Sequence, residues 1–124
     1  MNLQLLLKVN GVVSGINGLS AILMYNMWFN MAGLEATGPT IALCQSLGVA
    51  AVGLAIISWR TASIAGDAIN SYGQLFAYVH SAFAVITLYH LMKGYLPTQQ
   101  PLYINLVISV ILAAAFFNYS RKTE

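Results

Sequence analysis

Charged residues are scarce in this chain of 124 residues. It has only five lysine or arginine residues and three aspartate or glutamate residues, 6% of the sequence. A soluble domain of this length carries roughly 31 charged residues, because such domains average about 25% charge. This shortage excludes an ordinary soluble enzyme, whose surface needs charge to stay in water. The net charge of +2 comes from too few basic groups to indicate binding to nucleic acid.

Cysteine and proline are also rare. Cys44 is the single cysteine, which excludes an internal disulfide bond and a metal site built from several thiolates. What the chain has in abundance is apolar residues, which make up 59% of the sequence and give a mean hydropathy of +0.75. This composition predicts an integral membrane protein.

Four apolar stretches indicate the fold. They cover about residues 4–27, 39–59, 70–92 and 101–119. About 20 apolar residues suffice for a helix to cross a hydrocarbon core about 30 Å thick. The segments between the stretches are short, which favours antiparallel neighbours. We therefore expect an all-α fold over residues 1–124, a single domain of four transmembrane helices in an antiparallel up-down bundle.

Turn-forming residues separate the stretches. Pro39 suits the first turn of the second helix, and the segment 67–71 offers capping side chains for the third. Gly94 is expected to end the third helix. The segment from Phe29 to Pro39 is expected to be a loop on the outer side of the membrane.

The basic residues predict the orientation. With four spans both termini share a side, and that side carries Lys8, Arg60, Arg121 and Lys122. The opposite side carries only Lys93. Because loops rich in lysine and arginine stay on the cytoplasmic side, both termini are expected to face the cytoplasm.

Small residues recur at helical spacing in every apolar stretch. Helices in lipid associate through close packing at such residues, so their recurrence favours a tightly packed bundle. The residues are Gly11, Gly15, Ser14 and Gly18 in the first stretch, Ala42, Ser46 and Ala50 in the second, Gly73, Ala77 and Ser81 in the third, and Ser109 and Ala113 in the fourth.

Few polar residues fall inside the spans, and several lie at similar depth. His80 is near the middle of the third span, and Asn17 and Ser109 are near the middle of the first and fourth. Gln45 lies a little outside that level, and Thr87 is two turns from His80 on the same face. We expect Asn17, His80 and Ser109 to meet in the bundle. They form either a structural hydrogen-bond cluster or a binding site for a quinone headgroup, a lipid or a small neutral solute.

The sequence offers no catalytic constellation and no metal site. No acidic residue lies within a span, and no nucleophile is accompanied by a base. His80 and His90 lie about 15 Å apart along their helix and about 80° around it, so they cannot bind one haem iron from opposite sides. A bis-histidine haem would need a second chain. We therefore predict no catalytic residue and no cofactor, with quinone and haem as the minor alternatives.

A family resemblance rests on features spread along the chain. These are the outer segment 29–39, the small-residue run 48–54 and the pair Trp59-Arg60 at the following turn. The layout resembles the DoxX-like group of small four-helix membrane proteins. An arginine often expected early in the second helix of that group is absent, and Gln45 stands near its level. The resemblance implies a bacterial inner-membrane protein near a quinone-linked redox complex.

Two functions remain open from the sequence. The first is a non-catalytic accessory or structural subunit of a larger membrane complex, or a homo-oligomer. Such a chain would contact the lipid bilayer and other membrane chains or copies of itself, and no nucleic acid. The alternative is the binding or transport of a quinone, a lipid or a small neutral solute at the polar cluster. The small-residue faces favour the first and the polar cluster favours the second.

Overall fold

The structure is a computed structural model that describes residues 1–121, and within this range the chain forms helices and no strand. Its elements are α1 (Leu3–Leu23), α2 (Tyr25–Ala32), α3 (Gly38–Ile64), the 3-10 turn η1 (Gly66–Ala68), α4 (Ile69–Lys93) and α5 (Gln100–Arg121). Helices α1, α3, α4 and α5 are long and apolar enough to cross a membrane. The predicted all-α fold with four apolar spans is confirmed.

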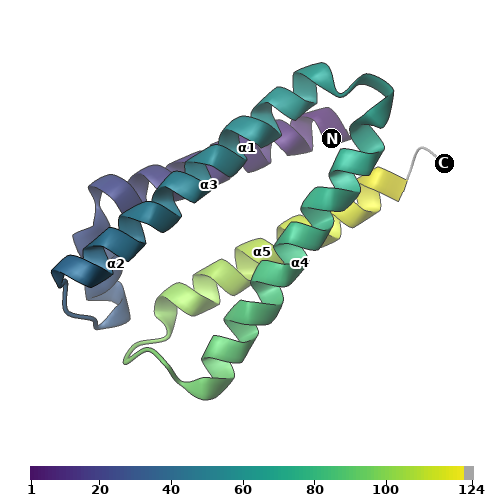
Figure 1. Cartoon of the computed structure of the whole chain (residues 1–124). Coiled ribbons are helices and arrows are strands. Elements are labelled where there is room, and N and C mark those ends of the chain that lie inside the picture. The colour runs from purple at the N-terminus through teal and green to yellow at the C-terminus, as the bar shows by residue number, and fades with distance from the viewer. Residues whose placement is uncertain (122–124) are drawn as a thin grey trace.

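The four long helices form two pairs, α1 with α3 and α4 with α5 (Figure 1). Within the first pair Gly11 lies against Ala55 and Gly18 against Gly48, so the two helices run antiparallel. The two pairs converge where α1 begins and α5 ends, and they diverge toward α2 (Figure 1). The bundle is therefore a wedge that is packed at one end and spread at the other.

Two glycines bring the backbones of α1 and α3 into contact. A Cβ atom added at Gly18 would lie 2.6 Å from the Gly48 carbonyl oxygen, and one added at Gly48 would lie 2.7 Å from the Gly18 carbonyl oxygen. No side chain fits at these distances, so the crossing requires glycine on both helices. Of the small residues expected to pack on the first span, Gly11, Gly15 and Gly18 lie in this interface, whereas Ser14 lines the cavity between the helix pairs.

The small-residue face expected on the second span does not lie in the interface between α1 and α3. Ala42, Ser46 and Ala50 are all exposed, so the expectation that they pack the bundle is wrong. The interface uses Gly48 and Ala55 instead. Gly48 follows Ser46 by two residues, which is about 200° around the helix, and the two sets therefore point in nearly opposite directions.

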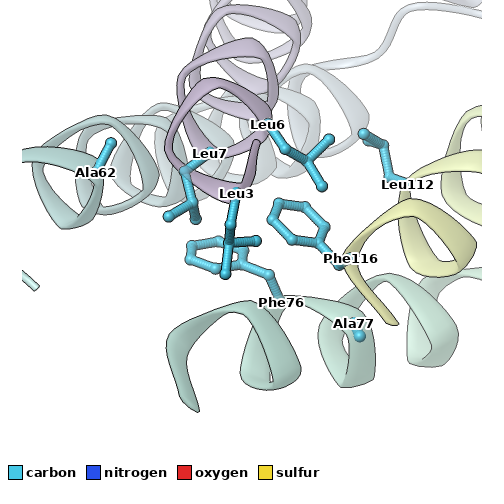
Figure 2. Packing of buried hydrophobic residues seen from close by; sticks show 8 residues of the cluster. All are labelled: Leu3, Leu6, Leu7, Ala62, Phe76, Ala77, Leu112 and Phe116. Atoms are coloured by element: carbon cyan, nitrogen blue, oxygen red, sulfur yellow. The ribbon is translucent and has the colours of Figure 1, made fainter. Parts of the chain in front are cut away.

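A hydrophobic cluster fills the packed end of the wedge (Figure 2). Every long helix contributes to it; its buried members are Leu3, Leu6, Leu7, Ala62, Phe76, Ala77, Leu112 and Phe116. The rings of Phe76 and Phe116 are stacked with centroids 5.5 Å apart. The two helix pairs are therefore packed together at this end by side chains from all four helices.

The first span is shorter than expected and is followed by a separate helix. α1 ends at Leu23, Met24 breaks the helical geometry, and α2 replaces the end of the expected span and the start of the expected outer loop. The indole nitrogen of Trp28 donates a 2.9 Å hydrogen bond to the Ser20 hydroxyl, which ties α2 back to α1. α2 ends at Gly33, whose φ of 69° is left-handed.

The remaining helix ends follow recognisable capping rules, with one correction. Thr37 and Thr40 form a capping box at the start of α3, where Pro39 occupies the first turn. Gly94 ends α4 in a left-handed conformation, as predicted. Asp67 does not cap α4, because it lies in η1 and the residue before α4 is Ala68, which has no capping side chain.

The surface of the long helices is apolar. Large hydrophobic side chains such as Leu47, Val85 and Met92 are 70–79% exposed. Such a surface is stable only in lipid, and the protein is a small integral membrane protein that contacts the bilayer. Of the basic residues used above to predict orientation, Lys122 lies outside the described residues.

Candidate functional site

A chain of hydrogen bonds crosses the wedge where the two helix pairs separate. The Ser58 hydroxyl of α3 donates to the Leu7 carbonyl oxygen at 2.6 Å, and the Asn10 amide nitrogen of α1 donates to the Ser58 hydroxyl at 3.0 Å. The Asn10 amide oxygen lies 2.8 Å from Nε2 of His80 on α4. Asn10 and Ser58 are 1% and 0% exposed, so water does not compete for these bonds.

His80 is held from a second side by an aromatic ring. Its imidazole stacks on Phe116 with ring centroids 5.8 Å apart and an angle of 7° between the planes. Phe116 belongs to the hydrophobic cluster at the packed end (Figure 2). His80 therefore lies next to that cluster, and its Nε2 is hydrogen-bonded to Asn10.

A cavity of about 520 Å³ occupies the space between the helix pairs beyond His80. Its walls are mainly apolar and come from α1, α3, α4 and α5, with α2 at the spread end. The polar side chains that line it are Ser14, Asn17, His80, Thr87, Asn105 and Ser109. A mainly apolar pocket of this size with a few polar groups is typical of a small-molecule site.

The end of the cavity farthest from His80 is closed by α2 and the segment before α5. Trp28, Phe29 and Pro101 line it there. The Thr98 backbone N–H donates to the Ala32 carbonyl oxygen at 3.2 Å, and the Thr98 hydroxyl donates to the Met31 carbonyl oxygen. Hydrogen bonds therefore join the two halves of the molecule at both ends of the cavity.

One side of the cavity is open. Leu47 on α3 and Phe83 on α4 both line it, yet they are 71% and 49% exposed. The surface around them is the apolar surface that faces lipid. The cavity therefore opens sideways, between α3 and α4, toward the hydrocarbon of the bilayer.

The residues expected to form the polar cluster divide into two groups. Asn17, His80, Thr87 and Ser109 all line the cavity. Gln45 does not, because its amide nitrogen donates to the Ile22 carbonyl oxygen at 3.1 Å and joins α3 to α1. Asn17, which the sequence analysis placed beside His80, is not its hydrogen-bond partner.

The partner of His80 is Asn10, and sequence reasoning missed it. Counting from the starts of the expected spans puts His80 about 15 Å deep and Asn10 about 9 Å deep. The count assumes parallel helix axes, whereas the two helix pairs diverge (Figure 1). Ser58 and Asn105 were also missed, because a single serine or asparagine in a span gives no signal of the neighbour that it meets.

The other titratable groups do not gather into a metal site. Within residues 1–121 no group of three or more histidine, cysteine, aspartate or glutamate side chains could hold a metal ion. His90 lies apart from His80 and packs against Tyr95, with ring centroids 5.7 Å apart. Cys44 lines the cavity, and its thiol donates to the Ala21 carbonyl oxygen at 3.5 Å.

The chain matches no protein-family model, no curated protein and no solved structure with significance. The DoxX-like resemblance drawn from the layout of the sequence therefore stays a prediction.

Proposed function

We propose that this membrane protein binds one uncharged amphiphilic molecule, a quinone or another lipid, in the cavity between its two helix pairs. The observation that carries the proposal is the cavity of about 520 Å³ with apolar walls and inward-facing polar groups that include Asn17, His80 and Ser109. Apolar walls hold a hydrocarbon portion, and the polar groups fix the position of a headgroup.

The lateral opening favours a ligand that arrives from the bilayer. A solute dissolved in water would reach the cavity past α2, where the Thr98 hydrogen bonds to Met31 and Ala32 close the way. A lipid-soluble molecule enters between Leu47 and Phe83 without leaving hydrocarbon. The described residues that line the cavity include no acidic residue and no lysine or arginine, which favours an uncharged ligand, because an isolated charge within a membrane is costly.

The binding proposal is tested by filling the cavity. Ala50 is exposed and lines the mouth of the cavity, so Ala50→Phe fills space there without disturbing the α1–α3 contact. Ala42 is exposed on the same helix and does not line the cavity, so Ala42→Phe is the matched control. Each variant is purified in mild detergent, and its bound small molecules are identified by mass spectrometry.

We expect the original chain and Ala42→Phe to retain the same lipid or quinone at near one molecule per chain. Ala50→Phe should retain several-fold less. Equal retention by both variants, or no molecule enriched over bulk phospholipid, contradicts the proposal. Far-ultraviolet circular dichroism and gel filtration check that both variants are folded.

A second proposed role is that of a non-catalytic accessory subunit or a homo-oligomer. The exposed face of Ala42, Ser46 and Ala50 supports it, since small residues permit another helix to approach closely. We also propose a bacterial inner membrane with both termini in the cytoplasm, supported by Lys8, Arg60 and Arg121 near the ends of the spans that share one side. Ala42 and Ser46 do not line the cavity and Ala50 does, so a helix that packed on this face would border the mouth of the cavity.

A further inference from the structure

The Leu7 carbonyl oxygen determines the direction of each hydrogen bond in the series that runs through Ser58 and Asn10 to His80. A backbone carbonyl oxygen can only accept, so the single hydroxyl proton of Ser58 is donated to Leu7. Ser58 must then accept from its other partner, and the group that Asn10 turns toward it is the amide NH₂. The Asn10 amide oxygen is therefore the atom that faces His80.

The same reasoning fixes the tautomer of His80. Because the Asn10 oxygen can only accept, Nε2 of His80 must carry a proton and donate it across the 2.8 Å contact. A neutral imidazole has one N–H, so the lone pair is on Nδ1. Among the described residues, no acidic side chain lines the cavity and could hold the imidazole in its charged form.

Nδ1 of His80 is available to a ligand. Within residues 1–121 the hydrogen bond to Asn10 is the only one that His80 makes, and no buried side-chain nitrogen is left without a partner. Nδ1 is therefore accessible, and His80 lines the cavity. Asn17, Asn105 and Ser109 can each both donate and accept, so His80 is the group that discriminates.

We infer that the cavity selects an amphiphile whose polar end donates a hydrogen bond, a phenolic or alcoholic hydroxyl, and disfavours a carbonyl or ether at the same place. The inference rests on the proposed function and specifies its ligand. An acceptor placed against Nδ1 would leave two lone pairs facing each other, whereas a hydroxyl satisfies both atoms. For a ligand with two redox forms, the quinol would bind more tightly than the quinone.

Trp28 provides a reporter for this inference. It lines the cavity, and Trp59 is the only other tryptophan in the chain. Trp59→Phe leaves Trp28 as the single tryptophan, and Trp28→Phe leaves Trp59, which does not line the cavity, as the control. Both proteins are reconstituted in phosphatidylcholine nanodiscs and titrated with quenchers that carry a bromine atom on an alkyl chain.

Three quenchers with the same brominated chain separate the possibilities: a 4-alkylphenol, its methyl ether and the corresponding 4-alkylcyclohexanol. We expect a hydroxyl probe to quench Trp28 at about tenfold lower concentration than the methyl ether, which corresponds to one hydrogen bond. The tighter of the two hydroxyl probes shows whether the natural group is phenolic or aliphatic. Trp59 should show no preference.

Two variants test whether His80 causes the discrimination. His80→Phe keeps a ring against Phe116 but removes the acceptor, so the preference for hydroxyl over ether should fall to less than twofold. Asn10→Leu leaves His80 in place and removes the group that fixes its tautomer, so the preference should also fall. Asn10 does not line the cavity and acts as a positioning residue.

The outcomes distinguish the claim that the cavity binds an amphiphile from the claim that it prefers a hydroxyl group. Equal quenching of Trp28 by hydroxyl and ether, or tighter binding of the ether, overturns the inference about the ligand and leaves the cavity as a binding site. Quenching of Trp28 that does not exceed that of Trp59 for any probe overturns both. An unchanged preference in folded His80→Phe also overturns the inference.

Discussion

Asn10 joins three helices through one side chain. Its amide nitrogen reaches Ser58 on α3 and its amide oxygen reaches His80 on α4. Each of these atoms is buried in an apolar surrounding, where an unpaired polar group costs about 1–3 kcal/mol. Asn17, seven residues further along α1, lines the cavity, and its side chain makes no hydrogen bond within the described residues.

This contrast gives a prediction with a matched control on the same helix. Asn10→Ala should lower the free energy of unfolding by about 1–2 kcal/mol, because it removes two interhelical hydrogen bonds and leaves His80 Nε2 without its partner. Asn17→Ala should change it by less than about 0.5 kcal/mol. Unfolding in mixed micelles, followed by circular dichroism, measures both. Equal losses would show that the Asn10 bonds are not structural.

The sequence indicated the importance of His80 but not the identity of its partner. A lone histidine in an apolar span must find a polar neighbour, and this requirement follows from physical chemistry alone. Which neighbour it finds depends on how each helix is rotated and how the helix pairs tilt. Asn10 and Asn17 lie on one face of α1, and their spacing does not distinguish them.

At the scale of elements, the glycine contact makes α1 and α3 a closely packed pair. Gly48 of α3 lies against Gly18 of α1, whereas a Cβ at Gly53 of the same helix would meet no described atom within 4 Å beyond the adjoining backbone of its own helix. The two glycines are therefore opposite cases. Gly48 is required by the packing of α3 on α1, and Gly53 only weakens the helix.

Alanine should destabilise the protein at Gly48 but not at Gly53. Gly48→Ala places a methyl group 2.7 Å from the Gly18 carbonyl oxygen and should destabilise the protein by about 1–3 kcal/mol. Gly53→Ala should be neutral or stabilising by up to about 1 kcal/mol, because alanine favours helix. The unfolding assay described for Asn10 measures both. A neutral Gly48→Ala would contradict the close crossing.

The elements were predicted well where hydropathy alone decides them. The four spans follow from apolar runs, and the ends at Pro39 and Gly94 follow from residues with special backbone geometry. The break at Met24 was missed because no glycine or proline marks it. The apolar stretch runs past this break into the start of α2, whose direction is set by the Trp28 bond to Ser20 and by the Thr98 bonds.

At the scale of the whole molecule, two helix pairs face each other across a cavity. Their divergence is a property of how the pairs pack, which no single segment of the sequence encodes. Asn17, His80, Thr87 and Ser109, which the sequence marks as polar residues within the spans, do line the cavity, whereas Gln45 does not and the cavity itself could not be predicted.

The proposed orientation predicts which loops are accessible from outside the cell. In a Cys44→Ala background, Ala36→Cys in the segment before α3 should react with a membrane-impermeant maleimide on intact cells. Asp67→Cys in η1 should react only after the membrane is permeabilised. Both residues are exposed, so a difference in labelling reports sidedness. The reverse pattern would invert the orientation, and labelling of both on intact cells would contradict the single span, α3, that separates the two positions.

The wedge shape has a mechanical consequence. From His80 to Lys93 the axis of α4 extends about 20 Å beyond the point where the helix pairs converge. A rotation of about 5° about that point displaces the far end by about 2 Å, while the stacked rings of Phe76 and Phe116 hardly move. A ligand too wide for the cavity would therefore move α2 and the α4–α5 connection apart only by breaking the Thr98 hydrogen bonds to Met31 and Ala32, on the opposite side of the membrane from the contact of Phe76 with Phe116.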